Sequence, residues 1–521
     1  MKVHLEGLSL SHLDADVLVL PVYAQEDPAK LLASLDKGFD KAALAAWKTA
    51  AQEEGFSGKS GQQVWLPTYG VAPFKKICFY GLGKEADVNA AIYRKLGAQV
   101  SRRLAATPTP NVAAGTGSKK KGSAEKERSV CICLRDTKKL SEEMALEAAL
   151  ECFVLASFSF LRYKTQAQDE SRRNEPMSKR WTLSFKSGLS KAKFDATVKR
   201  ALTISQSTNL ARELIAEPPV YMTPTRLAHE ARRIAKEYGL DVKVLDAAQA
   251  EKLGMGAFLG VARGAKEEPR LIVLKYNYSR SKKTIGLIGK GITFDSGGLS
   301  LKPAQSMEHM KYDMSGAASV LATMQVVGAL KPKVSVLAVV AATENMPGDN
   351  ALHPGDVLKS MNGKTIEVNN TDAEGRLILA DAITYAIKEG VDELIDIATL
   401  TGAVVTALGR VAAGIMGSSP QMIAALMESG KSCGEQFWQL PLFDEYKEGL
   451  KSDIADLKNA GSRGEAGSSS AGMFIKEFTE NLPWVHMDVA GVSWLDRDKD
   501  ELNKGGTAFG VRTMSRYILS H

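Results

Sequence analysis

Short apolar runs alternate with amphipathic segments in the N-terminal third of the chain. Runs rich in β-branched and aromatic residues predict buried strands at residues 15–23, 75–83, 129–135 and 181–187. Apolar residues at helical spacing occur at residues 90–106 and 141–163. This alternation predicts a smaller α/β domain at the N-terminus.

The rest of the chain shows the same alternation. Further strands are predicted at residues 271–277, 284–291, 334–342, 364–368 and 394–400. Helical spacing occurs at residues 316–330 and 376–387. The pattern is typical of a mostly parallel sheet flanked by helices. Asn362-Gly363, placed between two apolar runs, predicts a hairpin turn.

A long helical pattern separates these two parts. It ends at Pro218 and Pro219, which do not continue a helix. We therefore expect a two-domain α/β protein with a domain at 1–188, a connecting helix at 189–216 and a larger C-terminal α/β domain at 217–521. Residues 107–127 are rich in Pro, Gly, Ser and Lys, and we expect a mobile insertion there.

Composition places the chain among ordinary globular proteins. Its 521 residues are 44% hydrophobic and 24% charged. Five cysteines, without metal-binding spacing, indicate reduced thiols. The N-terminus lacks the apolar core of a signal peptide, and no apolar run approaches the ~18 residues of a membrane span. We therefore expect a cytoplasmic protein with no membrane association.

The net charge of +7 leaves a second class of function open. Lysines and arginines concentrate in residues 118–128. Such a run is more typical of a solvated loop, but it permits attraction to nucleic acid. Nucleic-acid binding, alone or as a second role, is therefore the alternative hypothesis.

Polar and glycine-rich segments lie at the ends of three predicted strands. They are "FDSGG", "NTDAEGR" and "TLTGA". In open α/β sheets, ligands bind beyond the carboxyl ends of the strands, so we expect these segments to meet in one site. Together with "GKG", "LSLKP" and "MKYDMSGAA", they supply the candidate site residues Lys290, Asp295, Lys302, Asp313, Asp372, Glu374 and Arg376.

Each of these residues has a simpler interpretation when taken alone. Asp313 can be a helix N-cap, and Asp295 can begin a turn. Their joint placement at strand ends favours a metal site instead. Alternate residues of an extended segment share a face, so we expect Asp372 and Glu374 to point into one cleft, with the helix beginning after Gly375.

The donor types suit divalent cations. Carboxylates held close together repel, and a bound cation removes that penalty. Carboxylates favour Mg²⁺ or Mn²⁺, and Zn²⁺ also accepts them. Four carboxylates exceed the needs of one ion, whereas two ions about 3.5–4 Å apart suit hydrolysis. Lys290 can join them as a nitrogen ligand only if burial and the cations lower its pKa.

Several other mechanisms lack their motifs. The sequence contains no H-E-x-x-H zinc-protease motif, no G-x-S-x-G nucleophile elbow and no complete G-x-x-x-x-G-K-[ST] phosphate loop.

In order and spacing, the segments "GKGITFDSGG", "LSLKP", "MKYDMSGAA", "NTDAEGRL" and "TLTGA" resemble the leucyl aminopeptidase (cytosol aminopeptidase) family of dinuclear metallo-exopeptidases. "NLARELIAEPP", "TPTRLA" and "WVHMDVAG" match it too. The resemblance is clear from about Asn209 to the C-terminus, while the N-terminal domain shares only the general layout. It implies a metal-dependent aminopeptidase that removes N-terminal residues, preferably leucine or similar apolar residues, from peptides.

The resemblance also implies the metal centre. Asp295 and Glu374 would be shared by two divalent ions, and Asp372 would serve the first. Lys290 and Asp313 would complete the second. Zn²⁺ is the expected metal, with Mn²⁺, Mg²⁺ and Co²⁺ as alternatives. Because every expected ligand is present, a non-catalytic relative is disfavoured.

Two further residues carry implied catalytic roles. Lys302 would polarise the scissile carbonyl and stabilise the oxyanion. Arg376, with Gly375 and Leu400, would hold a bicarbonate that acts as general base on the metal-bridging water.

Substrate recognition follows from the same resemblance. The free α-amine of a peptide would bind the second ion and Asp313. The specificity pocket is expected to comprise Met310, Thr399, Gly402 and Ala490. Ser493 departs from the family, in which an apolar residue, often Met, is expected, so the preference can extend beyond leucine. The family also implies a homohexamer.

Overall fold

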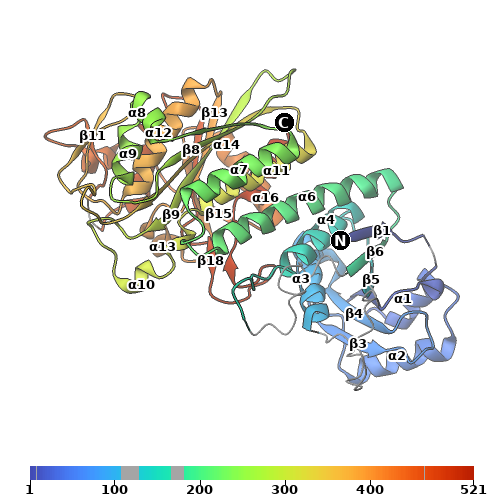
Figure 1. Cartoon of the computed structure of the whole chain (residues 1–521). Helices are drawn as coiled ribbons and strands as arrows, with labels where there is room; N and C mark the ends of the chain where they lie inside the picture. Colours follow the sequence, from blue (N-terminus) through green and yellow to red (C-terminus); the bar gives the residue numbers. More distant parts are fainter. Residues whose placement is uncertain (8, 107–127, 166–180, 463) are drawn as a thin grey trace, which may run out of the picture. The chain divides into compact units, whose positions relative to one another are not determined.

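The computed structural model describes residues 1–7, 9–106, 128–165, 181–462 and 464–521. The chain forms two compact units (Figure 1). The smaller comprises Met1–Ser205 and Asp498–Asn503, and the larger comprises Gln206–Arg497 and Lys504–His521. The division falls within helix α6 (Lys191–Ala216). The insertion predicted at 107–127 lies outside the described residues.

The smaller unit contains one six-stranded sheet. Its order is β1 (Lys2–Leu5), β6 (Trp181–Lys186), β5 (Arg128–Cys133), β2 (Val17–Tyr23), β4 (Lys76–Gly83) and β3 (Gln63–Pro67). All neighbouring strands are parallel except β3 and β4, which are antiparallel.

Helices cover both faces of this sheet. Helices α1 (Pro28–Leu35) and α2 (Lys41–Glu53) share a core with Leu18 and Leu20 of β2. On the opposite face, α3 (Ala90–Ala106) and α4 (Glu142–Ala156) share a core with Val17 and Val19. Because both faces are buried, β2 is apolar along its whole length. The described residues of this unit also form the 3₁₀ helices η1 (Leu10–His12) and η2 (Glu85–Asp87).

The larger unit is built on an eight-stranded sheet. Its order is β15 (Phe437–Gln439), β14 (Ala413–Gly417), β17 (Trp484–Asp488), β13 (Glu393–Ala398), β9 (Thr284–Asp295), β10 (Ser335–Asn345), β8 (Arg270–Tyr276) and β7 (Asp241–Leu245). The central strands β17, β13, β9 and β10 are parallel, as are β15 and β14. The remaining neighbours are antiparallel.

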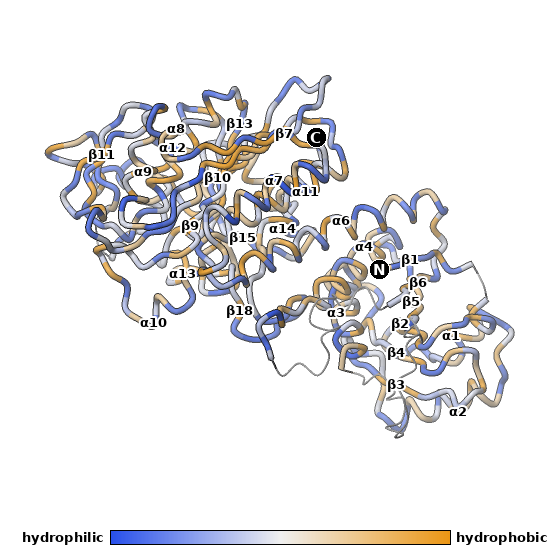
Figure 2. Tube along the Cα trace, in the orientation of Figure 1, coloured by the Kyte–Doolittle hydropathy of each residue, from blue (hydrophilic) through white to orange (hydrophobic). Residues whose placement is uncertain are grey.

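This sheet is also covered on both faces. One core includes α7 (Pro224–Tyr238), α11 (Ser315–Leu330), α14 (Pro420–Cys433) and α16 (Val511–Leu519). The other includes α8 (Ala247–Lys252), α9 (Gly256–Ala262), α12 (Glu374–Lys388) and α15 (Gly467–Lys476). Figure 2 shows hydrophobic residues concentrated along central strands such as β10, which is buried along nearly its whole length. The predicted two-domain α/β fold, with a mostly parallel helix-flanked sheet, is confirmed.

A three-stranded sheet lies beside the segment 369–377. Its order is β11 (Val357–Lys359), β12 (Thr365–Glu367) and β16 (Leu457–Lys458). The predicted hairpin at Asn362-Gly363 is confirmed, because β11 and β12 are antiparallel and Gly363 has a φ of 95°. The other short elements are α10 (Ala304–Met307), η4 (Met310–Tyr312), α13 (Gly402–Leu408), η5 (Asp444–Leu450), β18 (Trp494–Leu495) and β19 (Gly505–Gly506).

No described helix combines the length and the hydrophobicity needed to cross a bilayer.

Helix α11 approaches the sheet closely at Gly316. A Cβ atom at this position would lie 2.1 Å from the carbonyl oxygen of Ile397 and 3.0 Å from the backbone nitrogen of Lys290. Glycine is therefore required for the start of α11 to contact β9 and β13. This approach sets the position of Asp313, which lies just before the helix.

We predict that Gly316→Ala destabilises the larger unit by about 1–3 kcal/mol, because the clash involves backbone atoms that have little freedom to move. The loss is expected to outweigh the gain of about 1 kcal/mol in helix propensity. Chemical denaturation measures the difference. Gly188→Ala is the control, since its new Cβ would lie in ordinary contact with the Glu142 carboxylate oxygens, at 3.5 and 4.0 Å. An unchanged unfolding midpoint for Gly316→Ala would contradict the prediction.

Candidate active site

The predicted polar segments meet at one edge of the larger sheet. Parallel strands β13, β9 and β10 are neighbours, so their carboxyl ends lie together. Strand β9 ends at Asp295, β10 ends at Asn345, and Thr399 follows β13. This is the edge at which open α/β sheets bind ligands.

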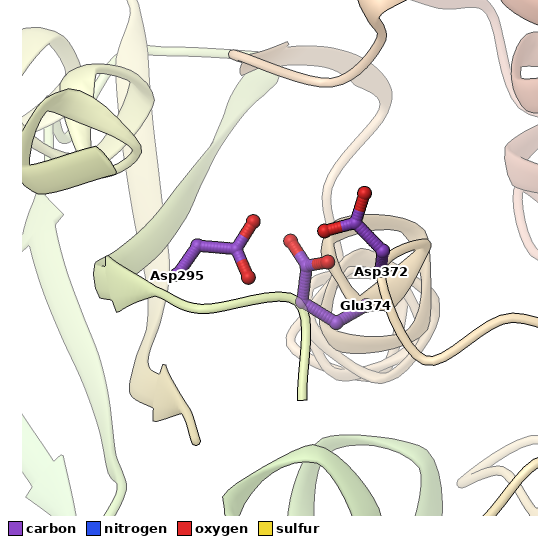
Figure 3. A group of neighbouring side chains, drawn as sticks. All are labelled: Asp295, Asp372 and Glu374. Carbon is purple, nitrogen blue, oxygen red and sulfur yellow. The ribbon is translucent and has the colours of Figure 1, made fainter. Parts of the chain in front are cut away.

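Three carboxylates converge at this edge. Asp295 comes from the end of β9, whereas Asp372 and Glu374 come from the turn before α12 and its first residue (Figure 3). One oxygen from each carboxylate lies within 4.8 Å of the others. Their side chains point toward one another in Figure 3, as a shared cation would require.

The local conformation differs from our expectation. Helix α12 begins at Glu374, not after Gly375, and residues 370–373 form a turn rather than an extended segment. The predicted extended conformation is therefore wrong, although Asp372 and Glu374 do point into one site. The turn, with an Asp372 amide that donates to Asn370 Oδ1 at 3.0 Å, brings the two carboxylates together.

Lys290 and Asp313 lie beside this group. The Lys290 ammonium is buried and lies 2.8 Å from Asp313 Oδ2, 2.9 Å from Glu374 Oε1 and 2.9 Å from the carbonyl oxygen of Thr399. The Thr399 hydroxyl donates to Asp313 Oδ1 at 2.7 Å. Asp313 does not cap α11, because Met314 holds the N-cap position without a side-chain hydrogen bond. The simpler interpretation of Asp313 is therefore excluded.

Lys302 approaches the same carboxylates from the loop after β9. Its ammonium lies 2.9 Å from Asp295 Oδ2 and is also ion-paired with Asp372. The loop turns tightly at Gly297, which has a φ of 86°. A Cβ atom there would lie 2.5 Å from the carbonyl oxygen of Ser300 and 2.8 Å from Asp372 Oδ1. Glycine at this position therefore lets Lys302 return to the site.

Burial of so many acids changes their protonation. Burial raises the pKa of Glu374 to about 7, and the nearby Asp295 adds to the rise. Burial also raises the pKa of Asp313 and of Asp372. A group of buried acids with raised pKa values is stabilised as carboxylates by cations, so the donor set fits divalent metal ions.

The carboxylates around Lys290 favour its protonated, ammonium form. Burial alone lowers the pKa of Lys290, but Asp313, Glu374 and Asp295 outweigh that effect and raise it. As a nitrogen ligand Lys290 must be neutral, so metal cations have to offset the surrounding carboxylates.

The Arg376 side chain is buried. Its Nη1 donates to the carbonyl oxygen of Asn459 at 2.8 Å, and its Nε has no hydrogen-bond partner among the described residues. Burial lowers the pKa of Arg376 to about 10. A buried guanidinium with a free donor favours an anionic ligand.

The other two residues predicted for bicarbonate make different contacts. The Leu400 amide donates to Asp488 Oδ1 at 3.2 Å. Gly375 makes room for Lys290, since a Cβ atom there would lie 2.7 Å from Lys290 Cε.

The residues predicted for substrate binding fall on three separate segments, because Thr399 and Gly402 share the segment "TLTGA". Met310 lies in η4, directly before Asp313, and Gly402 begins α13. The amide of Ala490 donates to Asp488 Oδ1 at 3.3 Å, the carboxylate that also contacts Leu400. Among them, Thr399 has a direct contact with Asp313. Ser493 is buried, and its hydroxyl donates to the carbonyl oxygen of Val489 at 2.7 Å.

Sequence reasoning missed three polar residues of the site. Asn345 ends β10, so the rule of strand ends could have found it. Asp488 ends β17, within a segment already matched to the family, and the same rule applies. Asn459 follows a strand of only two residues, and no pattern in the sequence marks it.

Comparison with known proteins identifies this arrangement. Residues 209–515 match the model of the cytosol aminopeptidase family catalytic domain. The chain belongs to the cytosol aminopeptidase family. Residues 19–130 match the N-terminal domain of the same family. The protein is therefore a metal-dependent aminopeptidase.

Related sequences match this chain over nearly its whole length. It is 40% identical to a probable cytosol aminopeptidase of Alkaliphilus oremlandii over 521 residues, covering 100% of this chain and 99% of the relative. It is also 40% identical to a probable cytosol aminopeptidase of Gloeobacter violaceus, covering 95% and 94% of the two chains.

Two solved structures have the same fold as this chain. A mutant of tomato leucine aminopeptidase superposes with a TM-score of 0.84 at 32% identity, covering 100% of this chain and 97% of that one. The bottromycin maturation enzyme BotP in complex with Mn superposes with a TM-score of 0.81 at 28% identity, covering 97% and 99%. The predicted family and enzyme class are thus confirmed.

We predict that Gly375→Ala lowers both kcat/KM and bound metal about 10–100-fold, the range typical of disturbed metal ligands. The new Cβ would lie 2.7–2.9 Å from the end of the Lys290 side chain. That end cannot move without breaking its contacts with Asp313, Glu374 and Thr399. Steady-state kinetics and metal analysis test this, again with Gly188→Ala as control. Activity and metal content equal to those of the wild type would refute it.

Proposed function

We propose that this aminopeptidase hydrolyses the first peptide bond of its substrates at a centre of two divalent metal ions, with a preference for N-terminal leucine or similar apolar residues. The observation that carries the proposal is the convergence of Asp295, Asp372 and Glu374 within 4.8 Å, with Lys290 joining them to Asp313.

The metal ligands are assigned by position. Asp295 and Glu374 would hold both ions as shared ligands, with Asp372 at the first ion and Lys290 and Asp313 at the second. Bound divalent ions supply two functions, a lower pKa of bound water and polarisation of the scissile carbonyl. Zn²⁺ is the proposed metal. Mn²⁺ is the first alternative, because BotP was solved with Mn, and Mg²⁺ and Co²⁺ follow.

Lys302 stabilises the negative charge that develops on the carbonyl oxygen. Its ammonium lies against Asp295, and its side chain is more exposed than that of Lys290. A substrate oxygen can therefore reach it. A fixed positive charge at this point is worth several kcal/mol in the transition state, roughly 3–4 by analogy with other oxyanion donors.

Arg376 holds bicarbonate, which supplies a general base. The supporting observation is the Nε of this buried guanidinium, which has no hydrogen-bond partner in the part of the chain that the structure describes. Gly375 and Leu400 contribute backbone groups. Because the Leu400 amide donates to Asp488, it has to be shared or to turn when the anion binds.

Substrate selection would begin with the free α-amine, for which Asp313 and the second ion would supply the binding site. Met310, Thr399, Gly402 and Ala490 surround the first side chain. The hydroxyl of Ser493 is turned toward the backbone, and a small residue stands where a larger apolar one is usual. The preference can therefore extend to side chains other than leucine.

Assembly and location complete the proposal. A cytoplasmic location is consistent with relatives named cytosol aminopeptidases, and the homohexamer is proposed from the family resemblance alone. The nucleic-acid alternative rests on the basic run at 118–128, which except for Arg128 lies outside the described residues. No feature of the described residues favours it over peptide hydrolysis.

We predict that chelation abolishes hydrolysis of leucyl-anilide and that Zn²⁺, Mn²⁺ or Co²⁺ restores it. Glu374→Ala is expected to remove a shared ligand, to lower metal content and to reduce kcat by at least about 1,000-fold. Glu389→Ala, exposed just past the other end of α12, is the matched control. Metal-independent activity, or a fully active Glu374→Ala variant, would exclude the two-metal centre.

We predict that Arg376→Ala lowers kcat about 100–10,000-fold, the usual contribution of a general base, while metal content stays unchanged. Removing bicarbonate from the buffer is expected to slow the wild type and to leave the variant unaffected. Kinetics in bicarbonate-free and bicarbonate-supplemented buffer test this. An equal response of both proteins would exclude the role of Arg376 in holding the base.

A further inference from the structure

Two buried asparagines hold the segment 369–377 from different strands. Asn345 is the last residue of β10, and Asn459 directly follows β16. Their exposed fractions are 4% and 0%. Buried amides are expected to satisfy their hydrogen-bonding groups, so their partners show what they fix.

The Asn345 side chain contacts both carboxylates assigned to two ions. Its Nδ2 donates to Asp295 Oδ1 at 2.8 Å and to the carbonyl oxygen of Thr371 at 3.1 Å, and it lies 3.5 Å from Glu374 Oε2. The Gly297 amide also donates to Asp295 Oδ1 at 2.8 Å. These two donors fix one oxygen of Asp295, so that the other faces the interior of the site.

The backbone of Asn345 strengthens this link. Its carbonyl oxygen accepts from the amide and the hydroxyl of Ser296, at 3.0 and 2.7 Å. Space around the side chain is also restricted, since a Cβ atom at Gly298 would lie 2.8 Å from Asn345 Oδ1. Asn345 thus joins the end of β9 to the turn before α12 with little freedom to rearrange.

Among the described residues, positions 369–373 supply the hydrogen-bond partners of the Asn459 side chain, all of them backbone groups. Its Oδ1 accepts from the amides of Asn369 and Asn370, at 3.0 and 3.3 Å. Its Nδ2 donates to the carbonyl oxygens of Asn370 and Ala373, at 2.7 and 3.3 Å. The carbonyl oxygen of Asn459 accepts from Arg376 Nη1. This residue therefore fixes the course of the turn and the direction of the guanidinium.

We propose that these asparagines are positioning residues with separate tasks. Asn345 orients the shared carboxylates Asp295 and Glu374 for metal binding, and Asn459 orients Arg376 for the base. The inference rests on the proposed two-metal function. Asparagine suits both places because it is neutral and carries donors and an acceptor in one plane. An aspartate at position 345 would add a fifth negative charge and would lose the donor to Asp295.

The test separates metal affinity from turnover. Asn345→Ala and Asn345→Ser are compared with Asn459→Ala and Asn459→Ser, and the exposed Asn277→Ala is the control. Stripped proteins are titrated with Zn²⁺ and with Mn²⁺ against a fluorescent chelator. Values of kcat and KM are then measured at saturating metal, with and without bicarbonate, and thermal unfolding of each stripped protein is recorded.

Asn345→Ala is expected to weaken metal binding about 10–100-fold, with most of kcat regained at saturating metal. Asn345→Ser keeps one donor and is expected to lose less. Asn459→Ala is expected to bind metal within about threefold of the wild type, and to lose about 10–100-fold in kcat, with little change in KM and a weaker response to bicarbonate.

Some results would overturn the inference. One is metal affinity in both Asn345 variants equal to the wild type. Another is a parallel loss of metal affinity and kcat in the variants at both positions, which would indicate general loosening of the fold. The Glu374→Ala variant distinguishes failure of this inference about the asparagines from failure of the proposed two-metal function. If Glu374→Ala loses metal and Asn345→Ala does not, only this inference fails. If Glu374→Ala binds metal like the wild type, the two-metal function itself fails.

Discussion

Mutual repulsion among buried carboxylates is the constraint on which the rest of this site depends. Asp295, Asp313, Asp372 and Glu374 gather at one sheet edge, where burial raises the pKa of three of them, Asp313, Asp372 and Glu374. Such a group persists only if positive charge and hydrogen-bond donors surround it. Two lysine ammoniums supply the charge, and an asparagine amide supplies a donor. The same requirement makes divalent cations the natural ligands of the site.

Because the charged groups of the site are crowded together, glycine is needed at several positions beside them. Lys290 reaches Asp313 and Glu374 only because glycine stands at 375, and α11 approaches β9 only because glycine stands at 316. Gly297 gives Lys302 its path back to Asp295. The glycines in the quoted segments are therefore as necessary as the charged residues, because they let charged side chains and backbone approach within contact distance.

The fold and most of the site could be predicted because their signals are local. Apolar runs locate the strands, and the rule of strand ends then groups Asp295, Asp372 and Glu374 before any coordinates are known. The sequence pattern places the start of α12 after Gly375, later than the structure does. The start depends on hydrogen bonds from Asn345 and Asn459 to the preceding turn rather than on local propensity. Asn459 itself could not be predicted, because its partners lie 86 to 90 residues away in the sequence.

The contacts that build the centre span long stretches of chain, and this has a consequence for how activity is acquired. Lys290 bonds to Thr399 across 109 residues, and Arg376 bonds to Asn459 across 83. Contacts between distant residues carry a loop-closure cost that contacts within a helix do not. We therefore expect the catalytic centre to form late in folding. A chain with most of its helices formed, but with β9, β13 and the small sheet not yet joined, has the secondary structure of the enzyme and none of its chemistry.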